Sequence, residues 1–131
     1  MILSEEQKEN ITKDLDEWTE KQYGDKTLKE RQKLGMFFTP AALVIKMIEK
    51  FTDLDDDILD PTAGSGNLIV GCILAGADPK RCFANELDKD TYNLLVERLT
   101  KYNVPKENIT NFDVFSADFR KKYMGFNFGV K

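Results

Sequence analysis

Apolar residues in the N-terminal part of the chain recur at the spacing of α-helices. Within residues 4–23, Ile11, Leu15 and Trp18 lie three or four positions apart among charged residues, which predicts an amphipathic helix with one narrow apolar stripe. The stretch 41–51 predicts another helix with a single buried face. That face would consist of Leu43, Val44, Met47, Ile48 and Phe51.

From residue 58 onward, short apolar runs alternate with longer runs of helical periodicity. They predict strands near residues 58–60, 82–87, 109–114 and 126–130, and helices near residues 66–75 and 89–102. In the second of these helices, the residues expected to be buried are Tyr92, Leu95, Val96 and Leu99. Strands that alternate with helices imply right-handed crossovers and a parallel sheet. The pattern therefore predicts an α/β fold.

Length and charge narrow the possible classes of protein. At 131 residues the chain has the size of one domain. We divide it into an N-terminal helical extension, 1–34, and an α/β domain, 35–131. The formal net charge of −4 argues against a protein that holds nucleic acid by overall electrostatics. Two basic clusters, Lys26–Lys33 and Arg120–Lys122, are expected to be solvated helical faces that bind DNA weakly at most.

The residue types that are absent exclude several kinds of chemistry. The chain contains no histidine, which excludes Ser-His-Asp catalysis, Cys-His catalysis and histidine-ligated metals. Cys72 and Cys82 have no metal-ligand spacing and are expected to be buried thiols in a reducing cytoplasm. The sequence has neither a basic-plus-apolar leader nor an apolar run of about 18 residues. A cytoplasmic location without membrane contact is therefore expected.

The most informative motif lies at residues 57–68, which read D-I-L-D-P-T-A-G-S-G-N-L. A strand would end at Asp60, Pro61 would stiffen its exit, and the turn 64–66 would lead into a helix. Such a loop aims backbone N–H groups and a helix N-terminus at a ligand. No lysine follows the second glycine, and residue 69 is isoleucine where a dinucleotide fingerprint has its third glycine. The motif favours an adenosine-containing ligand without a pyrophosphate, and a purely structural turn is the alternative.

A carboxylate follows the next predicted strand. Glu86 lies beside the apolar Leu87, where it could accept hydrogen bonds from both ribose hydroxyls, a known use of this position in nucleotide-binding sheets. The alternative is a solvated or helix-capping acid. Asp88 suits the capping role better, because it directly precedes the predicted helix 89–102. We therefore assign ribose recognition to Glu86.

Four motifs, taken in order, resemble those of a known family. They are G-M-F-F-T-P at residues 35–40, D-P-T-A-G-S-G-N-L at 60–68, N-E-L-D at 85–88 and S-A-D-F at 116–119. Over residues 33–131 the chain is similar to the cofactor-binding half of adenine-specific DNA methyltransferases, and in particular to modification subunits of type I restriction systems. The resemblance implies a Rossmann-like methyltransferase fold and S-adenosylmethionine as the cofactor.

The resemblance also implies which residues hold the cofactor. Phe38 and Thr39 would border its methionine end, and Asp60 would hold its amino group. Glu86 would bind the ribose and Leu87 would contact the adenine. The full set carried over is Phe38, Thr39, Asp60, Pro61, Ala63, Gly64, Gly66, Asn67, Glu86, Leu87, Asp118 and Phe119.

Within that set, the loop and the fourth motif have distinct implied roles. Ala63, Gly64 and Gly66 would let the cofactor approach the backbone. Asp118 would accept a hydrogen bond from the adenine amino group, and Phe119 would stack on the adenine ring. Ordinary core packing is the alternative for Phe37, Phe38 and Phe119. No residue is assigned a catalytic role or a metal.

The resemblance stops before the catalytic motif. Family members continue after the fourth strand with an acidic or amide residue, two prolines and an aromatic residue, which hold the flipped target base. The prolines of this chain are Pro40, Pro61, Pro79 and Pro105, so it contains no such motif. We expect a fold truncated after about four parallel strands that binds the cofactor but is inactive alone. The apolar edge of residues 126–130 would invite a second copy of the chain or a partner subunit.

The leading interpretation is a domain of a DNA adenine methyltransferase-like protein that binds S-adenosylmethionine and S-adenosylhomocysteine. One alternative is a non-enzymatic decoy or interaction subunit that has kept the methyltransferase fold. The acidic helix 4–23 with Trp18 could then supply its contact surface. The other alternative is an active methyltransferase for a small substrate that uses Asp118 or Asn127.

Overall fold

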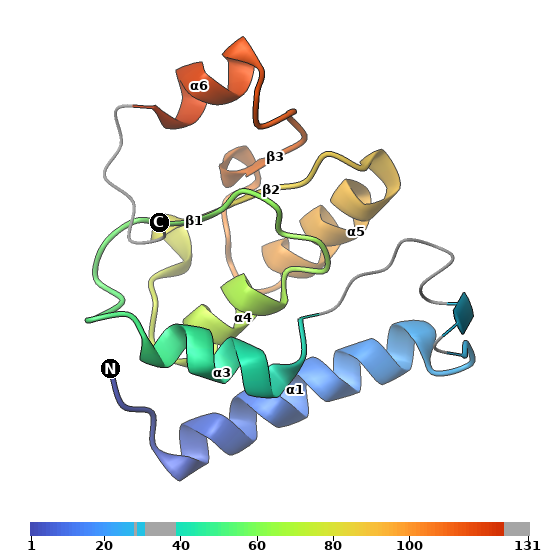
Figure 1. Ribbon diagram of the computed structural model, residues 1–131, viewed down its shortest axis with the longest axis vertical. Coiled ribbons are helices and arrows are strands. Elements are labelled where there is room, and N and C mark those ends of the chain that lie inside the picture. Colours follow the sequence, from blue (N-terminus) through green and yellow to red (C-terminus); the bar gives the residue numbers. More distant parts are fainter. Residues whose placement is uncertain (28, 31–38, 125–131) are drawn as a thin grey trace.

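A small parallel sheet forms the centre of the structure (Figure 1). The computed structural model describes residues 1–27, 29–30 and 39–124. Its strands, in spatial order, are β1 (Ile58–Asp60), β2 (Cys82–Asn85) and β3 (Ile109–Thr110). Both neighbouring pairs are parallel, which confirms the sheet type predicted from the alternation of strands and helices. The predicted fourth strand, 126–130, and the apolar edge expected on it lie outside the described residues.

Helices lie on both sides of this sheet. The longer ones are α1 (Glu5–Tyr23), α3 (Ala41–Glu49), α4 (Asn67–Leu74), α5 (Lys89–Thr100) and α6 (Ala117–Tyr123), and two 3-10 turns, η1 (Pro79–Arg81) and η2 (Lys106–Asn108), precede β2 and β3. Helices α4 and α5 make the crossovers between consecutive strands, and α1 and α3 contact α4. Helix α6 lies beyond the strands, away from α1 and α3 (Figure 1).

Side chains of β2 alternate between these two layers. Cys82 and Ala84 have no exposed surface and belong to the hydrophobic cluster built with α4 and α5. Phe83, between them, points to the opposite face. There its ring meets that of Tyr123 in α6 edge-on, with 6.3 Å between the ring centroids. The sheet is therefore covered on both faces, as buried parallel sheets require.

Side-chain caps set where several helices begin. Ser4 and Gln7 form a capping box at the start of α1, in which each side chain accepts from the other's backbone N–H. The Asp88 carboxylate accepts from the backbone N–H of Thr91 at 3.0 Å, which confirms that Asp88 caps the helix that follows it. The sequence pattern does not predict α6, which Ser116 caps in the same way.

Strand β3 is shorter than the predicted strand 109–114. Its pairing with β2 ends at Thr110, opposite Asn85. Two residues later, the backbone N–H of Phe112 donates to Oδ1 of the Asn85 side chain at 2.9 Å. This side-chain acceptor takes the place of the next backbone acceptor in β2, so the chain turns away from that strand.

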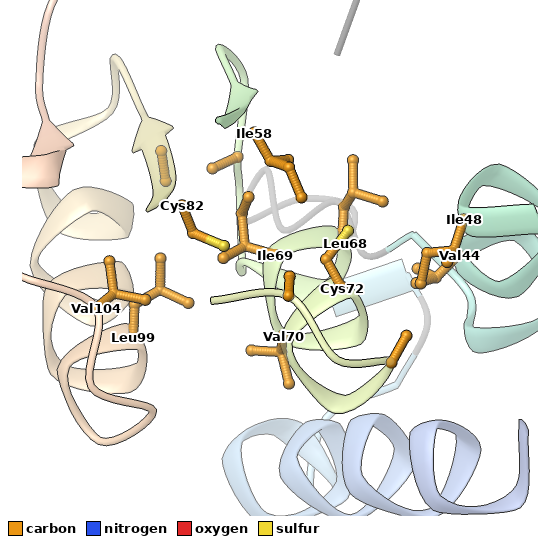
Figure 2. Packing of buried hydrophobic residues seen from close by; sticks show 14 of the residues in the cluster. Val44, Ile48, Ile58, Leu68, Ile69, Val70, Cys72, Cys82, Leu99 and Val104 are labelled. Carbon is orange, nitrogen blue, oxygen red and sulfur yellow. The ribbon is translucent and has the colours of Figure 1, made fainter. Parts of the chain in front are cut away.

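The hydrophobic core lies on one side of the sheet, among α1, α3, α4 and α5 (Figure 2). Ile69 of α4 and Val44 of α3 have no exposed surface. The two helices approach closely at Gly71, where an added Cβ would lie 2.5 Å from Cγ1 of Val44. Ile11 and Leu15 of α1 belong to the same cluster. The N-terminal helix is therefore packed into the core of the α/β unit, while the division at residues 34 and 35 stays a prediction.

The buried face of α3 is narrower than the sequence predicts. Val44 and Ile48 are buried as expected, but Leu43 is 49% exposed and Met47 is 36% exposed. The helix contacts its neighbours through the row that contains Ala41, Val44 and Ile48. Leu43 and Met47 lie one position before members of that row, which turns them toward solvent. Within the described ranges, no helix combines the length and the apolar composition needed to cross a membrane.

Candidate functional site

The loop between β1 and α4 has the tight glycine turn expected from its sequence. Gly64 and Gly66 have φ angles of 56° and 89°, in the region that favours glycine. The backbone N–H of Gly66 donates to the carbonyl of Ala63 at 2.8 Å, which closes the turn. At Gly66, an added Cβ would also lie 2.9 Å from Cδ1 of Leu95 in α5. Glycine is therefore needed here both for the backbone conformation and for the approach of α5.

A pocket of about 520 Å³ opens at the carboxyl ends of β1 and β2, beside this loop. This is the usual position of a ligand in an open α/β sheet, and the volume suits a small organic ligand. The residues that line it are Thr39, Asp60, Thr62, Ala63, Gly64, Ser65, Leu68, Glu86, Asp88 and Thr91. The pocket therefore brings together the first turn of α4, the glycine loop and the start of α5.

Glu86 joins the two strand ends across the pocket. Its Oε1 accepts from the backbone N–H of Gly64 at 3.0 Å, and its Oε2 accepts from the backbone N–H of Asp88 at 2.8 Å. These bonds fix the carboxylate at the pocket wall. A carboxylate has about four lone-pair sites, so two donors leave room for hydroxyl groups of a ligand. The two bonds give Glu86 a role in holding the loop, while its ribose role stays a prediction.

Asp60, at the end of β1, is the second carboxylate of the pocket. Burial raises the pKa of Asp60 above its ordinary value; the hydrogen bond from the Thr62 backbone N–H opposes this, and the nearby charge of Glu86 adds to it. Two carboxylates that share one pocket repel each other. A ligand with positively charged groups would relieve that repulsion, so the pocket favours a cation.

Asn67, which the sequence places among the cofactor-binding residues, is directed away from the pocket. Its side chain is buried; Nδ2 donates to the carbonyl of Thr39 at 2.8 Å, and Oδ1 accepts from Nη1 of Arg98 at 2.8 Å. The same nitrogen of Arg98 also donates to the carbonyl of Ser65 at 2.8 Å. Asn67 and Arg98 thus connect two segments of the pocket wall from beneath.

A second buried amide links all three strand ends. The Asn85 side chain donates to the carbonyls of Pro61 and Phe112, and it accepts from the hydroxyl of Thr110. Its backbone carbonyl accepts from Ala63 at 2.9 Å. Because every polar atom of this buried amide is paired, the glycine loop is held in one position relative to β2 and β3.

The predicted cofactor residues fall into three groups. Thr39, Asp60, Ala63, Gly64 and Glu86 line the pocket, while Pro61, Gly66 and Asn67 belong to its loop or lie behind it. Leu87 is 66% exposed and follows Glu86 without lining the pocket. Phe37 and Phe38 lie outside the described residues.

Asp118 and Phe119 belong with Leu87 to the third group, because the structure does not bring these residues into the pocket. Asp118 is exposed on α6. The ring of Phe119 is half-buried against Tyr123, with 4.8 Å between the ring centroids. Packing within α6 is therefore what the structure shows for Phe119, and the adenine contacts assigned to both residues stay predictions.

Several residues of the site are absent from the sequence-based assignment. Thr62, Ser65, Leu68, Asp88 and Thr91 line the pocket. Arg98 and Asn85 support it from below. For Arg98 a signal exists, because it lies three residues after Leu95 in the apolar stripe of its helix, where an exposed cation is not expected. No group of three or more acidic, cysteine or histidine side chains suited to a metal ion occurs in the part of the chain that the structure describes.

A parallel sheet, a glycine loop at the end of its first strand and an acidic residue after its second are features that this chain shares with nucleotide-binding α/β domains. Residues 7–127 match the family described as N-6 DNA Methylase, so the chain belongs to this family. No curated protein matches the chain. No solved structure matches it either.

Proposed function

We propose that this chain is the S-adenosylmethionine-binding part of a DNA adenine methyltransferase, and that the cofactor occupies the pocket at the ends of β1 and β2. Membership of the N-6 DNA methylase family makes it a methyltransferase-like protein. The observation that supports the cofactor most directly is the pair of carboxylates, Asp60 and Glu86, on one wall with the glycine loop. When bound, S-adenosylmethionine supplies an electrophilic methyl group on a positively charged sulfur.

The chemistry of the pocket fits this cofactor residue by residue. Asp60 would hold the ammonium group, because pairing with a cation offsets the cost of keeping that carboxylate charged in a buried position. Glu86 would accept from the ribose hydroxyls with the lone pairs that Gly64 and Asp88 leave unused. The glycine loop would let the ligand approach the backbone N–H groups at the start of α4.

We further propose that these residues do not complete methyl transfer alone. The sequence contains no acidic or amide residue followed by two prolines and an aromatic residue, so nothing in it would hold a flipped adenine. The exposed basic residues of α6, Arg120 and Lys121, offer only weak electrostatic contact with DNA in a chain of net charge −4. A partner chain or further residues would have to supply base recognition.

Calorimetric titration of S-adenosylmethionine and S-adenosylhomocysteine into the protein tests the cofactor site. Both ligands should bind, and Glu86→Gln should weaken both by about 1.5–3 kcal/mol, or roughly tenfold or more, because a charged hydrogen-bond acceptor is lost. Asp90→Asn is the matched control, since Asp90 carries the same charge on the exposed first turn of α5 and does not line the pocket.

The outcomes separate the proposal from the non-enzymatic alternative. No binding of either ligand by the folded wild-type protein would argue for an interaction subunit that has kept only the fold. Equal weakening by Glu86→Gln and Asp90→Asn would show that net charge, not the pocket carboxylate, determines the affinity. Detectable methylation of DNA by the purified chain would contradict the second part of the proposal.

A further inference from the structure

Arg98 is a buried cation whose contacts all lead toward or behind the proposed cofactor loop. The residue is 3% exposed. Its Nη1 donates to the carbonyl of Ser65 and to Oδ1 of Asn67, both at 2.8 Å. Ser65 lines the pocket, and Asn67 in turn holds the carbonyl of Thr39, which lines it as well. One guanidinium group therefore fixes both segments of the pocket wall that flank the start of α4.

The other side of this guanidinium faces the N-terminal helix. Its central carbon lies 3.9 Å from the centroid of the Trp18 ring in α1, within the range of a cation–π contact. A second link joins the same two helices, since the hydroxyl of Tyr102, just beyond α5, donates to Oδ1 of Asp14 at 2.6 Å. Trp18 thus covers one face of the Arg98 guanidinium group.

The buried position of Arg98 carries a desolvation cost. Among the described residues, its Nε and Nη2 are buried and have no hydrogen-bond partner. Burial lowers the pKa of Arg98 to about 10, although the nearby Tyr102, Asp14 and Tyr23 oppose the shift. An arginine buried at this cost is poorly explained by core stability alone, because an apolar side chain of similar size would avoid the desolvation.

We propose that Arg98 is a positioning residue for the cofactor loop and that Trp18 holds Arg98 in that position, so that helix α1 supports the ligand pocket. The inference rests on the proposed cofactor site for its effect on affinity, but not for its effect on the loop itself. It assigns α1 a role that neither the glycine motif nor the acidic residues of the pocket imply. The contacts that carry this support, called the route below, run from Trp18 through Arg98 to Ser65 and Asn67.

Two variants and a matched control test this route. Arg98→Met removes both hydrogen bonds and keeps an unbranched side chain, and Trp18→Leu removes the stacked ring. Lys101→Met, one turn further along from Arg98, removes an exposed cation whose ion pair is with Glu97 at the surface, at 3.9 Å. The measurements are hydrogen–deuterium exchange of the loop amides 62–68 without ligand, and the affinity for S-adenosylmethionine, with circular dichroism to establish folding.

Arg98→Met should speed exchange of the loop amides and weaken S-adenosylmethionine about tenfold or more, as expected when two charge-assisted hydrogen bonds are lost. Trp18→Leu should produce the same pattern more weakly, and the double variant should bind no more weakly than Arg98→Met alone, because both act through one contact. Lys101→Met should leave both quantities within about twofold of wild type.

A folded Arg98→Met protein with unchanged loop exchange and wild-type affinity would overturn the proposal. If Arg98→Met does not fold, Trp18→Leu decides, and unchanged loop exchange in that variant overturns the role of α1. If the wild-type protein does not bind S-adenosylmethionine, the proposed function fails, while the exchange measurement in the ligand-free protein still tests the position of Arg98.

Discussion

At the scale of single residues, Asp60 combines a proposed binding role with a cost to stability. Its side chain is half-buried at the end of β1, and that burial raises its pKa above the ordinary value of 3.8. The folded protein therefore binds a proton at Asp60 more readily than the unfolded chain does. Stability from this group is fully present below pH 3.8 and is lost as the pH rises through the higher folded pKa.

Asp60→Asn should therefore stabilise the ligand-free protein at neutral pH. The amide avoids the buried charge and can still accept from the backbone N–H of Thr62, so we expect a rise in Tm of roughly 2–5 °C. The same change should weaken S-adenosylmethionine, because the ammonium group loses its carboxylate. Thermal melts with and without ligand measure both effects.

The pH dependence supplies the control for this prediction. Below the ordinary carboxyl pKa of 3.8, Asp60 is protonated in both states, so the wild-type protein and the Asp60→Asn variant should melt together. A variant that melts below wild type at neutral pH would show that the charged form of Asp60 is favoured in the folded protein.

Whether a residue of the site could be predicted from the sequence depends on how close in sequence its interaction partners lie. Asp60, Gly64 and Asp88 could be predicted, because each lies at a strand end, a turn or a helix start that the residues directly beside it indicate. Arg98 and Asn85 could not, since their loop and strand-end partners Ser65 and Phe112 lie 33 and 27 residues away. A sequence pattern reports that Arg98 interrupts an apolar stripe, but it does not report which buried carbonyl the side chain reaches.

At the scale of elements, α3 and α4 approach each other closely at Gly71. Gly71→Ala should destabilise the protein by about 1–3 kcal/mol, because the new methyl group would lie 2.5 Å from Cγ1 of Val44. Val44 is β-branched and cannot easily turn away within a helix. The overlap should outweigh the gain in helix propensity of about 1 kcal/mol from replacing glycine. Urea denaturation measures the difference.

A double variant separates the overlap from other effects of Gly71→Ala. Val44→Ala removes the methyl group that the new side chain would meet, so the double variant should lose less stability than the two single changes added together. Strict additivity would mean that α3 and α4 adjust without the predicted strain.

Hydrophobic periodicity predicts the helices and strands well, but it predicts less well which face of each helix is buried. The crossover helices and parallel strands follow from apolar runs that alternate with helical spacing. The sequence places Leu43 and Met47 on the buried face of α3. Helix spacing alone does not determine which of two adjacent rows of side chains is buried. The contact of α3 with α4 at Gly71 determines this. Helix α6 has too few apolar residues to show helical periodicity. The N-cap residue Ser116 is the clearest feature of the sequence that indicates this helix.

At the scale of the whole molecule, α1 and the α/β unit share one hydrophobic cluster. Ile11→Ala should lower the free energy of unfolding by about 2–5 kcal/mol in a single transition, because Ile11 has no exposed surface and is packed among residues of the same cluster. Lys13→Ala, on the exposed side of the same helix, is the matched control and should change it by less than about 0.5 kcal/mol.

Denaturation followed by circular dichroism checks this prediction. Two separate transitions, with only the first affected by Ile11→Ala, would instead support residues 1–34 as an independent extension. The sequence predicts the N-terminal helix, but not where its stripe of Ile11 and Leu15 would pack, because a narrow apolar face can cover any matching surface.

Trp18 is the only tryptophan in the chain, and its ring lies over the guanidinium of Arg98. Indole emission responds to a positive charge held against the ring, so the intrinsic fluorescence of the unlabelled protein reports the position of Arg98. Through Ser65 and Asn67, a ligand that shifts the glycine loop should change that emission, and Arg98→Met should remove the change. Such a change would make Trp18 an optical probe of pocket occupancy, suited to stopped-flow measurement of how fast a ligand enters and leaves.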